Sequence, residues 1–69
     1  MAKIWRNRIE AGTQRLDHCP LKYRNDVIRL IREDIESGAF TKAQMAELVE
    51  DGMMSPEEYE EITGDDYEG

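Results

Sequence analysis

The sequence predicts an all-α fold: a small bundle of about four helices, in which a C-terminal capped helical hairpin packs on a longer central helix. Three observations predict this fold. No segment alternates apolar and polar residues over enough positions for a β-strand. Apolar residues recur at helical spacing through residues 20–37. A 14-residue unit that ends one helix and begins the next occurs twice, from Gly38 and again from Gly52.

The first helix is expected over residues 2–11, where Trp5 and its apolar neighbours form a stripe and Gly12 follows as a candidate C-cap. We expect Trp5 to be the best-buried aromatic side chain. Residues 13–19 show little periodicity beyond Leu16 and are expected to form a connector.

The second helix is expected over residues 20–37 and is the longest element. It is expected to begin with Pro20 at the first helical position, where the missing N–H has no helical partner to lose. Its apolar stripe is made of residues three and four apart, with one further residue that widens it: Tyr23, Val27, Leu30, Ile31 and Ile35, with Ile28.

The repeated unit predicts where the last two helices begin and end. Each copy starts with a glycine, which supplies the left-handed residue that ends a helix. A hydroxyl residue three positions later caps the next helix, and a Gln or Glu completes a capping box. The predicted cap residues are Gly38, Thr41, Gln44, Gly52, Ser55, Pro56 and Glu58, with Pro56 at the first helical position.

The helices that follow these caps are expected over residues 42–50 and 56–63. Phe40 with Met45, and Met54 with Tyr59, are placed as hydrophobic staples around the two caps. Both helices are too short to form alone in water, so they require packing against the second helix. The chain is expected to be one domain, residues 1–69, with a basic helical half at 1–37, repeated capped helices at 38–64 and an acidic tail at 65–69.

The charge of the chain is strongly divided along the sequence. Residues 1–32 carry a net charge of +5 and residues 33–69 a net charge of −12, which gives −7 in all. This polarity has three readings: it joins the halves within one chain, orders copies head to tail, or presents two charged faces to two partners. Within one chain, the expected pairs are Arg29 or Arg32 with Glu47 or Glu50.

Residue types that carry catalysis are scarce. The single His and single Cys are neighbours, His18 and Cys19, whereas a stable zinc site needs four ligands. The acidic terminus lacks the alternating oxygen pattern of a calcium loop, and no glycine-rich phosphate loop is present. We therefore expect no enzyme activity, no cofactor and no metal. A single Cys fits a reducing compartment, and no apolar run is long enough to span a membrane.

Two charged segments admit a second interpretation. Trp5 lies among Lys3, Arg6 and Arg8, a combination that can stack on bases and contact phosphates, but a core Trp beside solvated arginines is favoured. The acidic side chains of the last helix are favoured as its solvated face, with mimicry of nucleic acid as the alternative. They are Glu57, Glu58, Glu60 and Glu61.

The stretch GMMSPEEYEEITGDDY, residues 52–67, resembles the C-terminal signature of the XkdX-like small proteins encoded in tail modules of phages and defective prophages of Gram-positive bacteria. That signature has a glycine, an apolar residue, Thr or Ser, a Glu-rich pair, Tyr and Ile-Thr-Gly. The unit from Gly38 is similar to the same signature one repeat earlier. The resemblance implies a phage or prophage origin, in the bacterial cytoplasm or the virion. It implies no functional residues, because the family has no established activity.

We therefore expect a non-enzymatic interaction or assembly protein whose partner is a phage tail protein or a second copy of itself. An exposed Met53 or Met54, together with the acidic last helix, is expected to form the interface. Nucleic acid and membrane are not expected as partners. The candidate interaction residues are Met53, Met54, Tyr59, Glu57 and Glu61. The alternative is a regulatory protein that binds nucleic acid through its basic half or mimics nucleic acid through its acidic half.

Overall fold

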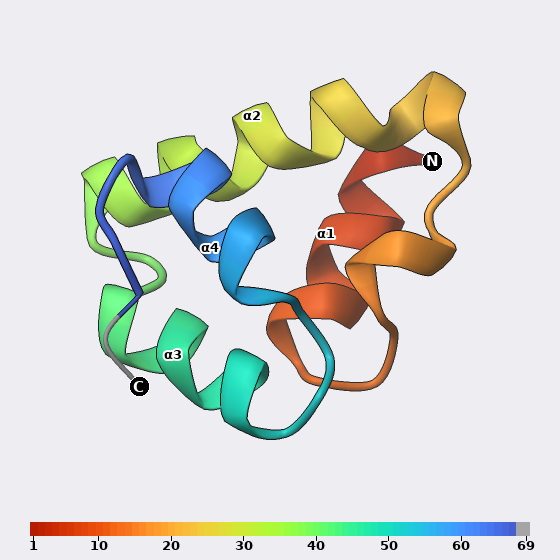
Figure 1. The fold of residues 1–69 in the computed structure, drawn as a ribbon. Helices are drawn as coiled ribbons and strands as arrows, with labels where there is room; N and C mark the ends of the chain where they lie inside the picture. The colour runs from red at the N-terminus through yellow and green to blue at the C-terminus, as the bar shows by residue number, and fades with distance from the viewer. Residues whose placement is uncertain (68–69) are drawn as a thin grey trace.

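The computed structural model describes residues 1–67 and is built from helices alone within that range. The all-α prediction is confirmed. The longest helix, α2, runs along one side of the molecule (Figure 1). In chain order the elements are α1 (Ala2–Glu10), a short 3-10 helix η1 (Leu16–His18), α2 (Leu21–Ser37), α3 (Lys42–Glu50) and α4 (Pro56–Thr63).

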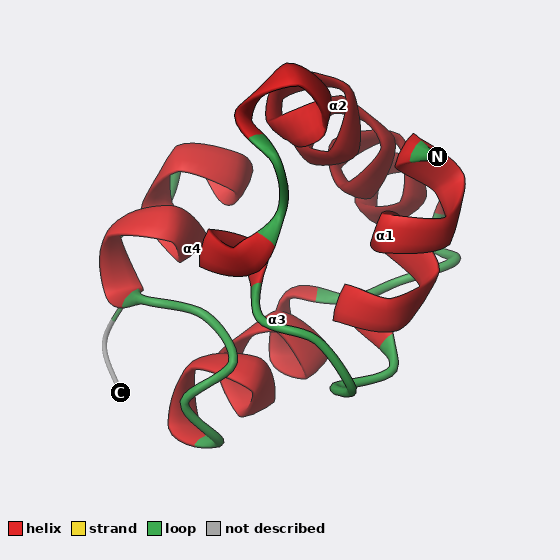
Figure 2. Ribbon diagram, turned by 90° about the vertical axis from the view of Figure 1, so that its right-hand side faces the viewer, coloured by secondary structure: helices red, strands yellow, loops and turns green. Residues whose placement is uncertain are grey.

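The four α-helices surround one core. Figure 2 shows α2 at the top and α3 at the bottom, with α1 and α4 on opposite sides between them. The helix α2 packs against α1 and α4, and α3 packs against α4 and α1. In the hairpin of α3 and α4, α4 therefore makes the main contact with α2, while α3 packs against α4 and α1.

The core draws on every helix and on the loops between them. Leu16, in the predicted connector, is fully buried. Its backbone N–H donates a hydrogen bond to the carbonyl of Met53 at 3.3 Å, which ties this segment to the turn before α4. The connector therefore carries a short helix and contributes to the core. The buried apolar residues are Ile9, Leu16, Cys19, Val27, Ile28, Ile31, Phe40, Met45, Leu48, Met54, Tyr59 and Ile62.

Two local predictions about the first half are wrong. Trp5 is only half-buried, whereas Phe40 and Tyr59 are 4% and 9% exposed. Trp5 lies one turn before the fully buried Ile9, nearer the N-terminus of α1, and packs at the edge of the core. Pro20 is the N-cap of α2 and not its first helical residue, because its ψ of 140° is extended.

Both predicted capping boxes are formed. The Gln44 N–H donates to Thr41 Oγ1 at 3.1 Å, and the Thr41 N–H donates back to Gln44 Oε1 at 3.0 Å. In α4 the Glu58 N–H donates to Ser55 Oγ at 3.1 Å, and the Ser55 N–H donates to Glu58 Oε1 at 2.8 Å. Pro56 occupies the first helical position. Four backbone N–H groups that have no partner inside a helix are thereby satisfied.

The two glycines that begin the repeated unit also have the backbone that a helix end requires. Gly38 has a φ of 85° and Gly52 a φ of 78°, a conformation that is costly for residues with a Cβ. At the end of α3, the Gly52 N–H donates to the carbonyl of Val49 at 3.1 Å. The N–H that follows, of Met53, donates to the carbonyl of Leu48 at 2.9 Å. This is a Schellman motif, and it turns the chain back toward α4.

Candidate functional site

The predicted interaction residues are divided between core and surface. Met54 and Tyr59 are 4% and 9% exposed, so the expectation of an exposed Met54 is wrong. Both residues belong to the staple around the α4 cap, which turns them toward the core. Met53 is half-buried and packs against the core, while Glu57 and Glu61 are exposed. Of the five candidates, only the two glutamates lie fully on the surface.

One of these glutamates is already held by α2. The guanidinium of Arg24 donates from Nη2 to Glu61 Oε1 at 2.8 Å and from Nη1 to Glu61 Oε2 at 3.1 Å. A parallel pair of this kind fixes both side chains. The hydrogen bond from Arg24 lowers the pKa of Glu61, and the same bond raises the pKa of Arg24. Glu61 therefore joins α4 to α2, which leaves Glu57 as the acidic candidate with no such partner within residues 1–67.

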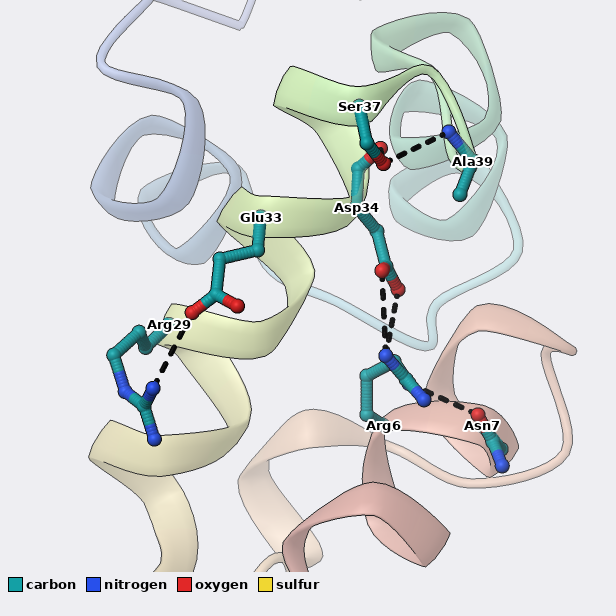
Figure 3. Close-up of polar contacts among 7 residues, drawn as sticks. All are labelled: Arg6, Asn7, Arg29, Glu33, Asp34, Ser37 and Ala39. Carbon is teal, nitrogen blue, oxygen red and sulfur yellow. Dashed lines mark hydrogen bonds and ion pairs between the residues drawn. The ribbon is translucent and has the colours of Figure 1, made fainter.

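The expected pairing of Arg29 or Arg32 with Glu47 or Glu50 is wrong. Arg29 pairs with Asp26 and Glu33 of its own helix, as Figure 3 shows for Glu33. Arg32 instead donates to the last backbone carbonyls of α4. The reason lies in the packing, since α2 faces α4 and not the exposed side of α3.

A third arginine joins α1 to α2. Arg6 Nη1 lies 3.1 and 3.3 Å from the two carboxylate oxygens of Asp34, and both side chains are largely buried (Figure 3). Glu10, one turn after Arg6, adds a second carboxyl group to this contact. Its pKa is raised to about 8, because burial disfavours the charged form and Asp34 lies beside it. Oε2 of Glu10 is buried and has no hydrogen-bond partner among the described residues.

These cross-helix contacts were not predicted from the sequence. The spacing of Arg6 and Glu10 shows that they share a face of α1, but not that Asp34 lies opposite them. The same holds for Arg24 and Glu61, because the rotation of α4 against α2 is fixed by the packing of apolar side chains. The available signal was the opposite charge of the two halves of the chain.

The cross-helix contacts determine which charges remain unused. Within residues 1–67, the cations with neither an ion pair nor a side-chain hydrogen bond are Lys3, Arg8 and Lys22. The corresponding exposed acids are Glu36, Glu47, Glu50, Asp51, Glu57 and Asp66. Three of these acids, Glu47, Glu50 and Asp51, lie in or directly after the last turn of α3.

An open cleft of about 410 Å³ lies where the ends of α2 and α4 meet the start of α3. Its two cations are engaged by the chain itself: Arg32 by carbonyls of α4, and Lys42 by an ion pair with Asp65. The cleft is lined by Arg32, Ile35, Glu36, Lys42, Ile62, Thr63 and Gly64.

The single His and the single Cys, the side chains most often used in catalysis or metal binding, do not line this cleft. His18 is exposed beside Asp17, and Cys19 is buried, which raises the pKa of its thiol. Among residues 1–67, no three His, Cys, Asp or Glu side chains are grouped so that they could hold a metal ion. Over the same residues, no helix combines the length and the apolar character needed to cross a membrane.

Comparison with known proteins gives one match. The model of the family described as "Phage uncharacterised protein (Phage_XkdX)" matches residues 33–67, slightly more than half of the chain. The match begins inside α2 and includes all of α3 and α4. No curated protein and no solved structure matches the chain.

Proposed function

This chain belongs to the Phage_XkdX family of phage proteins, and from that premise we propose that it is a non-enzymatic module of phage tail assembly. It acts by docking on a protein partner, in the cytoplasm of the bacterial host or in the virion. The tail assignment rests on the tail-module neighbourhood that the resemblance of residues 38–67 implies. The docking assignment rests on how the molecule uses its charges.

The observation that carries the docking assignment is that five of the eight basic side chains of residues 1–32 are engaged within the chain. Arg6, Arg24 and Arg32 each join two helices, and Arg29 is paired on its own helix. Guanidinium groups held in this way have little left to offer to the phosphates of a nucleic acid. The second half has the opposite character, because the acids at the end of α3 form no ion pair within residues 1–67.

The acids of α3 are unfavourably placed for an isolated molecule. Glu47, Glu50 and Asp51 lie at the C-terminal end of the helix, where the macrodipole opposes negative charge, and the last turn has no basic residue. They also repel one another. A partner that presents Lys or Arg to this end of α3 relieves both costs, and charge complementarity of this kind directs association and selects partners. We therefore propose the exposed side of α3 as the main docking surface.

The experiment is capture of purified phage tail proteins by this chain, with Glu47→Gln/Glu50→Gln as the test variant. The matched control is Glu36→Gln/Asp66→Gln, which removes the same charge at two other unpaired positions. We expect the chain to capture a tail protein, the test variant to lose capture, and the control to retain it. Circular dichroism checks that all three chains are folded. Capture of no tail protein contradicts the proposed function, and equal capture by both variants contradicts the proposed surface.

The second candidate is a regulator that mimics nucleic acid, and the same unneutralised acids favour it. In that case the partner is a basic nucleic-acid-binding protein, and capture weakens steeply with salt. The form of this alternative in which the chain itself binds nucleic acid has only Lys3, Arg8 and Lys22 as unengaged cations within residues 1–67. A gel shift at low salt distinguishes the two forms, and a shift at micromolar protein would support direct binding.

A further inference from the structure

The residues of α1 and its C-cap, Ala11, are divided between a packed side and an outer side. The packed side contains Ile9, Trp5 and the Arg6 that binds Asp34. At roughly 100° per residue, the exposed positions fall within an arc of about 140° on the opposite side. These positions, called here the α1 outer face, are Lys3, Ile4, Asn7, Arg8 and Ala11.

The α1 outer face combines apolar surface with unused positive charge. Ile4 is 46% exposed and is one of three large hydrophobic residues described as exposed in this chain. Lys3 and Arg8 lie on either side of it and have no ion pair within residues 1–67. The face contains no acid. Nearly all other cations are bound to the chain's own carboxylates or carbonyls. The α1 outer face is therefore the part of the basic half whose cations can pair with another molecule.

The exposed side of α3 is the counterpart of this face. It consists of Ala43, Gln44, Glu47, Glu50 and Asp51, called here the α3 outer face. The remaining exposed residue of α3, Lys42, lies to one side of this face and is paired with Asp65. The acids of the α3 outer face have no partner within residues 1–67, and the face has a small residue, Ala43, near its N-terminal end, as the α1 outer face has Ala11 at its C-terminal end. Both helices are nine residues long. The two surfaces therefore match in length and are opposite in charge.

We propose that the α1 outer face of one copy docks on the α3 outer face of a second copy. This proposal rests on the proposed assembly function and names a second copy as one of its partners. Lys3 and Arg8 pair with Glu50 and Glu47 across an antiparallel contact, and Ile4, which follows Lys3, is covered by the end of α3 that carries Glu50. Because the two faces belong to different helices, the contact is heterologous and leaves one unused face at each end. Copies therefore add in series, head to tail.

The physical chemistry of the two faces sets the strength of this contact. Exposed ion pairs contribute little individually, and the net charge of −7 opposes the approach of two copies. The contact is accordingly weak in isolation. It strengthens as salt is lowered, because screening lengths increase from about 8 Å at 0.15 M to about 30 Å at 0.01 M ionic strength. Alignment along a growing tail structure supplies the high local concentration that such a contact requires.

The test is sedimentation equilibrium of the full chain over a range of concentration and salt. Two charge-reversal variants are compared: Lys3→Glu/Arg8→Glu, in which both outer faces are acidic, and Glu47→Lys/Glu50→Lys, in which both are basic. We expect the average mass of the wild-type chain to rise with concentration at low salt. Each variant alone stays monomeric, because its faces repel, and an equimolar mixture of the two associates again.

The matched control is Arg15→Glu/Lys22→Glu, which changes the net charge as much as the first variant without touching the α1 outer face. It retains more association than the first variant. A wild-type chain that stays monomeric at millimolar concentration in low salt overturns the proposal, whatever the variants do. So does a mixture of folded variants that fails to associate. Neither result affects capture of tail proteins, so the proposed function is tested separately.

Discussion

The guanidinium of Arg32, in α2, donates from Nε to the backbone carbonyl of Ile62 at 3.1 Å and from Nη2 to the carbonyl of Glu61. These carbonyls belong to the last turn of α4, which has no basic residue of its own. The carbonyls at the end of a helix have no partner inside the helix and carry its partial negative charge. A side chain from the longest helix thus completes the end of the last one.

Replacing Arg32 by Ala should lower the free energy of unfolding by about 1–2 kcal/mol, as expected for charge-assisted hydrogen bonds at a helix end. Arg32→Lys should lose less, because it keeps the charge but not the fork of donors. Urea titration measures both. Arg29→Ala is the control, since Arg29 has only exposed pairs on its own helix and should change stability by less than about 0.5 kcal/mol. Equal losses for both arginines would contradict the capping role.

The Arg24–Glu61 contact should give a coupling free energy of about 0.5–1 kcal/mol in a double-mutant cycle, because the two side chains are only partly shielded from solvent. Its pH dependence follows from the pKa of Glu61, which Arg24 lowers. A lowered pKa adds stability above the ordinary pKa of a glutamate, and this stability disappears as the pH falls through the folded value. Urea titrations of the wild type, the two single variants and the double variant, at neutral and acidic pH, measure the coupling and its pH dependence. A coupling that persists in acid would contradict this account.

Glu10 should give the opposite pH dependence. Its pKa is about 8 in the folded chain and near 4.5 when unfolded, so between these values the folded state binds more protons than the unfolded state. Stability from this group should therefore be greatest at acidic pH, fall as the pH rises from about 4.5 to 8, and remain low above that. The charged groups facing it are Asp34 of α2 and Arg6 of its own helix.

Glu10→Gln, which cannot ionise, should remove this decline and be more stable than the wild type at alkaline pH. Urea midpoints across the neutral and alkaline range measure the difference. Glu36→Gln is the control, because Glu36 is exposed and has no ion pair within residues 1–67. A wild-type midpoint that stays level between acidic and alkaline pH, while Glu10→Gln follows it, would show that the buried acid pair does not form.

The turn between α3 and α4 should respond to two changes of different origin. Ser55→Ala should cost about 1 kcal/mol, since the Glu58 N–H loses its acceptor. Gly52→Val should cost more, because a β-branched residue resists the left-handed conformation. A Cβ at Gly52 would meet no atom within 4 Å, so the cost arises from backbone strain and not from a clash. Gly52→Asn, which tolerates this conformation, should therefore be milder in a urea titration. Equal costs for Asn and Val would contradict this explanation.

The sequence predicted what depends on near neighbours along the chain. The capping boxes at Thr41 and Ser55 need only residues three apart, and the helix ends at Gly38 and Gly52 need one glycine each. The contacts between helices could not be predicted, because they depend on how each helix is rotated and packed relative to its neighbours. The partners of Arg24, Arg32 and Asp34 belong to this class.

The first half of the chain shows the same limit. Trp5 was expected to be the best-buried aromatic from its size and neighbours, but burial depends on its position along α1 relative to α2. Leu16 had no periodic neighbours, so nothing in the pattern indicated that its segment lies against the turn at Met53. Met54 was placed both in the staple and, with Met53, among the residues of a possible interface, and the packing of the staple against the core decided the outcome.

The family match begins at Glu33, and this boundary divides the core between two halves of the chain. On one side are Phe40, Met45, Leu48, Met54, Tyr59 and Ile62, and on the other are Ile9, Leu16, Cys19, Val27, Ile28 and Ile31. A peptide of residues 33–67 would thus keep its caps but expose six core side chains. Residues 1–32 contribute the six core residues that cover them in the full chain. The matched segment contains the residues that begin and end α3 and α4. The remainder of the chain supplies the core side chains against which these two short helices pack.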